Sequence, residues 1–205
     1  MWSKSLWIVY WAIDKFMDRI SKFATVSLGT NTVFSVYHLI VGVLTRSWWM
    51  FTLGFYYLIL SVVRFFVLKT KKKRQSTAKI TGILLMFLTL PLVGTVILAV
   101  MRDRGHALHM IIMIAMATYA FTKITLAAIH WVKSRHSSSA KIVTLRSISF
   151  ADAFVSIFAL QRSMLVSFEG MSGDEIRLMN ALLGSAVCVI VFLLGLRLLY
   201  PKNMH

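Results

Sequence analysis

The chain has 205 residues, of which 58% are hydrophobic and 15% are charged, and its formal net charge is +16. A soluble domain is about 45–50% apolar and about 25% charged, so this composition excludes an ordinary soluble protein. Apolar runs of roughly 20 residues, each long enough to cross the hydrocarbon core of a bilayer, recur along the whole chain. We therefore expect an all-α integral membrane protein with little chain left for a soluble domain.

The positive charge has two possible explanations. In a soluble chain a net charge of +16 would suggest a nucleic-acid partner. In a membrane protein, basic cytoplasmic loops and their attraction to anionic lipid headgroups explain the same excess. We therefore expect membrane lipids as partners of the basic loops, and no nucleic acid. The single cysteine, Cys188, cannot form a disulfide within the chain.

The first 22 residues predict a separate amphipathic helix. Charged residues recur there at spacings of three and four, and apolar residues fill the positions between them. The charged face consists of Asp14, Lys15, Asp18, Arg19 and Lys22. Such a helix lies in the membrane interface rather than across the membrane. We do not expect a signal peptide, because Asp14 rather than a small-residue cleavage site follows the first apolar stretch.

The remaining chain, residues 23–205, predicts one transmembrane domain of six helices. The expected spans are residues 23–45, 48–68, 80–101, 107–132, 142–168 and 176–200. Fifteen of the 23 Lys and Arg residues precede the first span, lie in 69–79 or 133–146, or follow the last span. Only four lie in the loops on the other side. Basic residues are retained in the cytoplasm, so both termini are predicted to be cytoplasmic. We expect the membrane to be a bacterial plasma membrane.

With both ends on one side, the six spans form three hairpins that go out and return. Each returning helix has one basic residue in its inner half, namely Arg64, Lys123 and Arg197. This regularity suggests a threefold hairpin repeat. The three hairpins share little similarity at the level of individual residues.

Ionisable residues within spans are costly to place in lipid and are therefore candidates for function. Asp152 is the only acid within a span, and Lys123 is the deepest base. Lys123 lies too deep to reach the headgroups, so Asp152, at a similar depth, is its natural partner. Arg64 and Arg197 lie near the inner ends of their helices, where they can also extend to the headgroups.

Two interpretations of these residues stay open. In the first, they line a cytoplasm-facing cavity whose excess of bases favours a small anionic or phosphate-bearing ligand. The candidate ligand-binding residues are Arg64, Lys123, Asp152, Arg197, Tyr57 and Tyr119. In the second, Lys123 and Asp152 form a structural ion pair that joins the fourth and fifth helices.

No catalytic motif is present in the sequence. There are no paired carboxylates, no His/Cys cluster, no glycine-rich phosphate loop and no nucleophile beside a base. We therefore expect no enzyme activity, no cofactor and no metal site. His38 is expected to be a packed or interface residue rather than a metal ligand, because no Asp, Glu or Cys stands near it at ligand spacing.

Two segments carry a family resemblance. The start of the transmembrane domain resembles that of the cation diffusion facilitator transporters in Asn31, His38, Gly42 and Ser47. Residues 137–156 are similar to the passage between that family's fourth and fifth helices. The resemblance implies six spans with cytoplasmic ends. In that family the second and fifth helices each contribute two metal ligands, Asp or His, four residues apart. Here Asp152 is retained, but Ile148 stands where its partner would be, and the second span offers no ligand. The resemblance therefore implies a relative that has lost the Zn²⁺ site.

Three functions are compatible with the sequence. The first is a small membrane transporter, or a substrate-binding membrane subunit, with a positively charged cavity. The second is a non-catalytic accessory or scaffold protein that binds partner proteins, a second copy of itself or anionic lipids through its basic cytoplasmic face. The third, an enzyme of lipid metabolism, is the least favoured for want of acids. A cavity reaching Lys123 and Asp152 would favour transport, and a packed pair would favour the scaffold.

Overall fold

The computed structural model describes residues 3–44, 46–70, 75–101, 110–134, 139–167 and 171–200. Within these ranges the side chains are described from residue 24 onward, except those of residues 75, 110–112, 115, 130, 133, 134 and 166. The described chain is helical apart from a few residues at helix ends, and no strand occurs within it. The helices are α1 (Ser3–Leu44), α2 (Trp48–Lys69), α3 (Gln75–Met101), α4 (Met110–Ser134), α5 (Ala140–Ser167) and α6 (Gly173–Leu199). The prediction of an all-α protein is confirmed.

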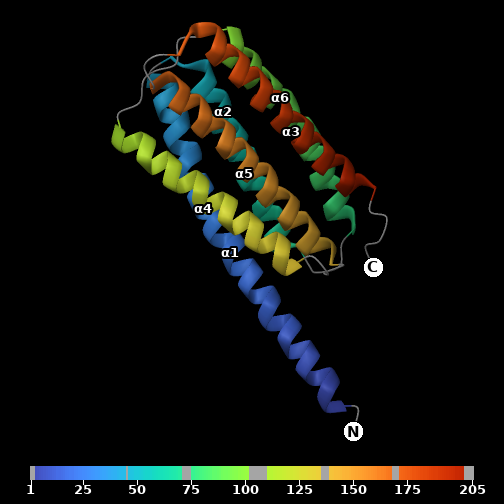
Figure 1. Cartoon of the computed structure of the whole chain (residues 1–205). Coiled ribbons are helices and arrows are strands. Elements are labelled where there is room, and N and C mark those ends of the chain that lie inside the picture. Colours follow the sequence, from blue (N-terminus) through green and yellow to red (C-terminus); the bar gives the residue numbers. More distant parts are fainter. Residues whose placement is uncertain are drawn as a thin grey trace.

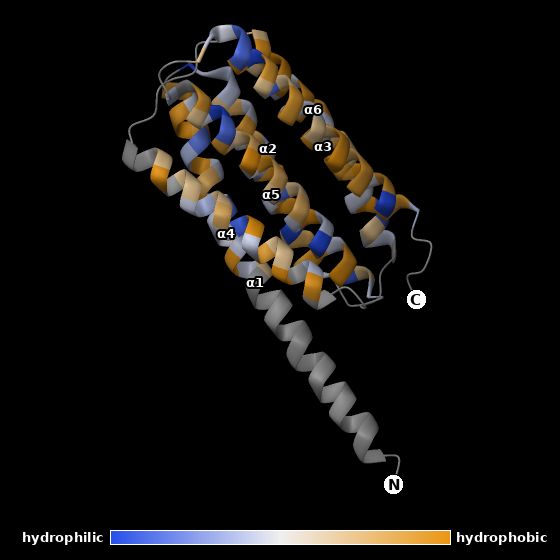
Figure 2. Cartoon of the chain, in the orientation of Figure 1, coloured by the Kyte–Doolittle hydropathy of each residue, from blue (hydrophilic) through white to orange (hydrophobic). Residues whose placement is uncertain are grey.

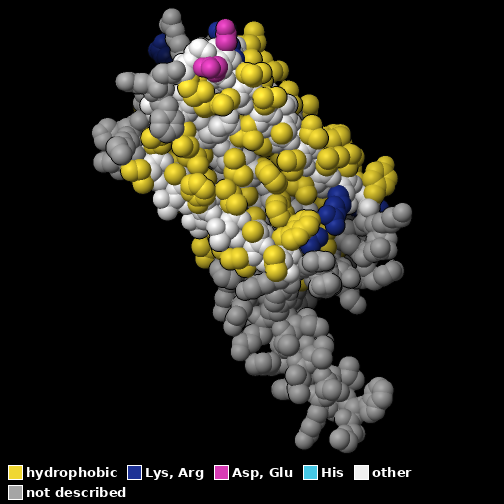
Figure 3. Space-filling view, viewed as in Figure 1, with side chains coloured by type: hydrophobic (Ala, Val, Ile, Leu, Met, Phe, Trp, Pro, Cys, Tyr) yellow, Lys and Arg dark blue, Asp and Glu magenta, His cyan; other side chains and the backbone are white. Residues whose placement is uncertain are grey.

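Five of these helices are long and apolar enough to cross a membrane. The candidate spans are Ala24–Leu44, Trp48–Lys69, Ser76–Met101, Ala140–Leu165 and Gly173–Leu199. In α4 the apolar stretch found among the described side chains is shorter, Met116–Ile129. Large apolar side chains are exposed along the outer faces of α1, α2, α3 and α6. Figure 2 shows hydrophobic residues along the helices between the two ends of the bundle, and Figure 3 shows hydrophobic side chains spread over the visible face. Such a surface suits lipid rather than water, which indicates an integral membrane protein.

Apart from the start of α1, the helix ends differ from the predicted span ends by up to five residues, and the largest difference is the start of α3 at Gln75. The span 48–68 agrees with α2 within one residue. The last span was expected from residue 176, whereas α6 begins at Gly173. A capping box explains the difference, because the Ser172 hydroxyl accepts from the Glu175 N–H and the Glu175 carboxylate accepts from the Ser172 N–H.

Helix α5 lies at the centre of the bundle and packs against α2, α3, α4 and α6. Of its most apolar window, 72% is buried inside the protein. Helices α3 and α6 lie side by side along one flank, and α1 pairs with α2 on the other (Figure 1). The ends of α2, α4 and α6 lie at the same end of the bundle as the starts of α3 and α5. The described parts of the two basic segments, residues 69–70 and 75–79 of the first and 133–134 and 139–146 of the second, therefore lie at the same end.

Helices that follow one another along the chain as hairpins are not all packed against each other. Helices α1 and α2 pack together, and so do α5 and α6. Helices α3 and α4 run in opposite directions but are not a packed pair: α3 packs along α6, and α4 packs along α5. The order of spans going out and returning stays a prediction, and the sequence made no prediction of whether the helices of a hairpin pack together.

The first helix also differs from the expected division at residue 22. Helix α1 is continuous from Ser3 to Leu44, and its first half extends beyond the bundle (Figure 1). The side chains of residues 1–23 lie outside the described ones. The placement of residues 1–22 in the membrane interface therefore stays a prediction.

The α3–α6 contact depends on two glycines. A Cβ added to Gly82 would lie 2.8 Å from the carbonyl oxygen of Gly195. A Cβ added to Gly195 would lie 3.0 Å from the carbonyl oxygen of Gly82. Small residues that allow two backbones to approach are a common basis of helix packing in membranes. The two helices are thus held together by close backbone contact.

Gly82→Val is expected to lower the unfolding temperature in detergent, because its side chain must push α6 away. The expected loss is about 1–3 kcal/mol of unfolding free energy. Gly94→Val is the matched control on the same helix, since nothing lies within 4 Å of a Cβ at Gly94. Equal melting temperatures for the two variants would contradict this account of the contact.

Candidate functional site

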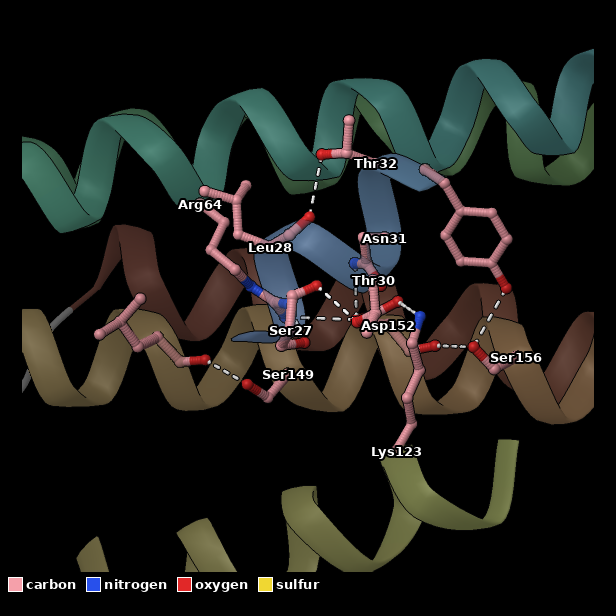
Figure 4. Close-up of polar contacts among 12 residues, drawn as sticks. Ser27, Leu28, Thr30, Asn31, Thr32, Arg64, Lys123, Ser149, Asp152 and Ser156 are labelled. Atoms are coloured by element: carbon pink, nitrogen blue, oxygen red, sulfur yellow. Dashed lines mark hydrogen bonds and ion pairs between the residues drawn. The ribbon is translucent and has the colours of Figure 1, made fainter. Parts of the chain in front are cut away.

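Four helices meet around the carboxylate of Asp152, which lies on α5 and is 1% exposed. Its Oδ1 accepts a hydrogen bond from Lys123 Nζ on α4 at 2.5 Å. Its Oδ2 accepts from Asn31 Nδ2 on α1 at 2.8 Å and from Arg64 Nη2 on α2 at 3.3 Å (Figure 4). We call Asn31, Arg64, Lys123 and Asp152 the polar core. It links all four helices through one carboxylate.

Hydroxyl groups fix the orientation of the polar core. The Tyr119 hydroxyl donates to Asn31 Oδ1 at 2.7 Å, which turns the amide so that its Nδ2 faces Asp152. Arg64 Nη1 donates to the hydroxyl of Ser27 on α1. Through these contacts, Asn31 and Arg64 are each held by a second hydrogen bond in addition to the one to Asp152.

A second chain of hydrogen bonds reaches Asp152 from the backbone side. The Ser156 hydroxyl donates to the Asp152 carbonyl oxygen at 2.8 Å. Because that proton is already committed, the Tyr57 hydroxyl is the donor in its 3.1 Å hydrogen bond to Ser156 Oγ. Tyr57 thereby contacts α5 one turn after the carboxylate.

Aromatic rings surround the ammonium group of Lys123. Its Nζ lies 4.2 Å from the ring centroid of Tyr119 and 4.7 Å from that of Tyr57. Tyr119 in turn stacks on Phe34, with ring centroids 3.7 Å apart. Ring faces attract cations, and the attraction is stronger where water is excluded. The two tyrosines therefore help to accommodate the charge of Lys123 in an apolar interior.

The polar core carries an excess of positive charge. Arg64 and Lys123 are cations that are 0% and 6% exposed, and one carboxylate faces both of them. The formal charge of these three groups is therefore +1. In addition, Arg64 Nε is buried without a hydrogen-bond partner. Burying an unbalanced charge costs several kcal/mol, so this arrangement is more expensive than a simple neutral pair.

His38 lies beside the polar core. It is 1% exposed, and its Nδ1 donates to the carbonyl oxygen of Phe34 at 2.8 Å. Its ring centroid lies 5.9 Å from that of Tyr57. The other ring nitrogen, Nε2, is buried and has no hydrogen-bond partner. His38 is thus a packed residue, as the sequence predicted, with one polar atom left unsatisfied.

Five of the six residues expected from the sequence therefore meet in one cluster, and the sixth does not. Arg197 is exposed in the last turn of α6 and takes part in none of the hydrogen bonds or ion pairs described above. Its position suits extension to the headgroups. Sequence reasoning missed Asn31 and Ser27 as members of the cluster, because only ionisable residues were considered. A buried amide within an apolar span was the available signal.

The described residues of this site do not form a suitable set of ligands for a metal ion. Among the described residues, no three His, Cys, Asp or Glu side chains come close enough to hold a metal ion. Both oxygens of Asp152 face N–H donors instead. The chain matches no family model, no curated protein and no solved structure. Nothing in these comparisons links it to the cation diffusion facilitators.

Substitutions in the polar core are expected to have unequal effects. Asp152→Asn leaves two buried cations without a counter-charge, so a loss of about 3–5 kcal/mol of unfolding free energy is expected. Lys123→Met leaves Arg64 and Asn31 on the carboxylate and should cost less. The double variant should recover part of the loss, because its net charge equals that of the native site. Thermal unfolding in detergent measures all three.

Arg177→Gln is the control for these substitutions, because Arg177 forms an exposed ion pair whose loss should change stability little. Equal losses in Asp152→Asn and Lys123→Met, fully restored in the double variant, would instead identify an ordinary neutral ion pair. That result would contradict the proposed excess of positive charge.

Proposed function

We propose that the chain is a small membrane transporter, or the substrate-binding subunit of one, for a small anionic or phosphate-bearing ligand. The observation that carries this proposal is that two buried cations share one carboxylate. Guanidinium and ammonium groups are the side chains that bind oxyanions most strongly. A ligand oxyanion would supply the negative charge that the polar core lacks.

In this proposal Asp152 takes the place of the ligand in the unliganded protein. Its oxygens occupy N–H donors of Arg64 and Lys123 that an oxyanion would otherwise use. Binding then requires the ligand to share or displace the carboxylate on these donors. Tyr57 and Tyr119 would flank the ligand as they now flank Lys123.

Binding of small anions to the purified protein tests this function. Inorganic phosphate, sulfate and a nucleoside monophosphate are expected to raise the unfolding temperature of the native protein. They should raise that of Asp152→Asn more, because the anion replaces the missing carboxylate. Lys123→Met and Arg64→Met should lose the effect. Choline chloride is the control for ionic strength.

A positive result would be followed by uptake of labelled anion into proteoliposomes, which separates transport from binding alone. If none of the three anions stabilises either the native protein or Asp152→Asn, the transport proposal is wrong.

The second candidate function is the accessory or scaffold protein. The observation that favours it is the packed Lys123–Asp152 pair, which is buried and in direct contact at 2.5 Å, the arrangement expected of a scaffold. In that case the polar core only fixes how four helices pack. The basic end of the bundle would then bind anionic headgroups, a partner protein or a second copy of the chain.

For either function we propose six spans, with both termini in the cytoplasm of a bacterial plasma membrane. The uneven distribution of Lys and Arg supports this orientation. The length of α4 supports a sixth crossing, since its 25 residues extend about 37 Å as a helix.

Single cysteines introduced into a Cys188→Ala background test the orientation. Ser76→Cys and Ser139→Cys lie at the basic end, and Asp174→Cys lies at the other end, where Asp174 is 93% exposed. In intact cells, a membrane-impermeant maleimide is expected to label only the cysteine at position 174. Labelling at 76 or 139 before the cells are opened would contradict the proposed topology, because it would place the basic end outside the cell.

A further inference from the structure

The turn between α1 and α2 has an unusual residue at its centre. The Ser47 N–H donates to the Gly42 carbonyl oxygen at 2.9 Å, and the Arg46 N–H donates to that of Val43 at 3.2 Å. This pair of hydrogen bonds defines a Schellman motif, in which the residue at the position of Arg46 is left-handed and is usually glycine. Arg46 has a φ of 49°, and it is the one non-glycine residue with positive φ among those described.

An arginine at this position is less favourable than a glycine, because its Cβ crowds the backbone in the left-handed region. Glycine would form the turn equally well without that strain. Strain of this kind persists where a side chain is required for another reason. The turn therefore points to a use for the Arg46 guanidinium that is separate from folding.

A pocket of about 320 Å³ opens beside the turn. It is lined by Gly42, Val43, Arg46, Ser47, Trp48 and Phe51. Its volume falls at the lower end of the range of ligand pockets, about 300–1,000 Å³. Apart from Arg46 and Ser47, the residues that line it are apolar or glycine.

Close approach of the two helices shapes this pocket. A Cβ added to Gly42 would lie 2.6 Å from the backbone nitrogen of Phe51, so α1 and α2 touch at that level. Trp48 follows directly in the sequence and is 64% exposed. Because α1 and α2 are both long enough to span the membrane, their junction lies at the membrane–water interface, where tryptophan is favoured.

The charge of Arg46 is available to a ligand. None of the ion pairs in the described part of the chain involves Arg46. A guanidinium binds phosphate through charge-assisted, often bidentate hydrogen bonds. A cation at the rim of an apolar pocket in the interface matches a molecule with an anionic head and a hydrocarbon tail.

We infer that this pocket binds one phospholipid with a net anionic headgroup. Arg46 holds the phosphate, and the first part of an acyl chain packs against Val43, Trp48 and Phe51. The site is at the opposite end of the bundle from the basic segments, so it is distinct from their general attraction for anionic lipid. It is also independent of the polar core.

Native mass spectrometry of the full chain in detergent tests the inference. With added phosphatidylglycerol, one retained lipid per chain is expected, and phosphatidylcholine should be retained at least about tenfold less. Arg46→Gly is the decisive variant, because glycine suits the left-handed turn and the protein stays folded. We expect it to weaken phosphatidylglycerol retention about tenfold and to leave the unfolding temperature equal or higher.

Two further variants separate the two parts of the site. Val43→Trp fills the pocket and should lower retention of both lipids. Arg177→Gln removes another exposed arginine at the same end of the bundle and should leave retention unchanged. Glycerol phosphate, which has a head but no tail, should not displace the lipid.

The inference is overturned if Arg46→Gly retains phosphatidylglycerol as the native protein does. It is also overturned if Arg177→Gln lowers retention equally, which would indicate a diffuse charge effect. Full displacement by glycerol phosphate would show an anion site that makes no use of the pocket. Anion stabilisation through the polar core should be unchanged in Arg46→Gly, so the two proposals can fail separately.

Discussion

A single carboxylate must be satisfied inside an apolar bundle, and much of the structure follows from that requirement. Asp152 lies on the central helix, where water does not reach it. Its oxygens draw one donor from each of α1, α2 and α4. Each donor fixes the rotation of its helix, since a turned helix would leave either the donor or the carboxylate unsatisfied. The polar core thus fixes the rotation of four helices relative to one another.

The other flank of the bundle is built on a different principle. Helices α3 and α6 meet at Gly82 and Gly195, where the backbone of each helix lies against backbone and side-chain atoms of the other. Close contact of this kind depends on shape alone and requires no polar group. The two flanks share α5, which packs against both. One side of the protein is therefore specified by hydrogen bonds and the other by small residues.

An excess of one positive charge distinguishes the polar core from a simple structural ion pair. A neutral Lys–Asp pair would already satisfy the carboxylate at lower cost. The addition of Arg64, fully buried and with one unpartnered N–H, increases the cost without a matching acid. Asn31 and the hydroxyls of Ser27 and Tyr119 reduce this cost by hydrogen bonding, but they carry no charge. The excess of positive charge is the basis of the proposal that the site binds an anionic ligand.

The sequence by itself determined the all-α class, the approximate bounds of the apolar helices and the short set of ionisable residues within them. These depend on local composition, because a run of apolar residues is recognisable without knowing its neighbours. The pairing of Lys123 with Asp152 also followed, since their similar depth and the cost of an isolated charge leave few partners. Only the tertiary structure decided that α3 packs on α6 rather than on α4, that Asn31 and Arg64 complete the site, and that Arg197 lies outside it. Those facts depend on which face each helix turns inward, and helices that are apolar on nearly every side carry too weak a periodic signal to fix that rotation.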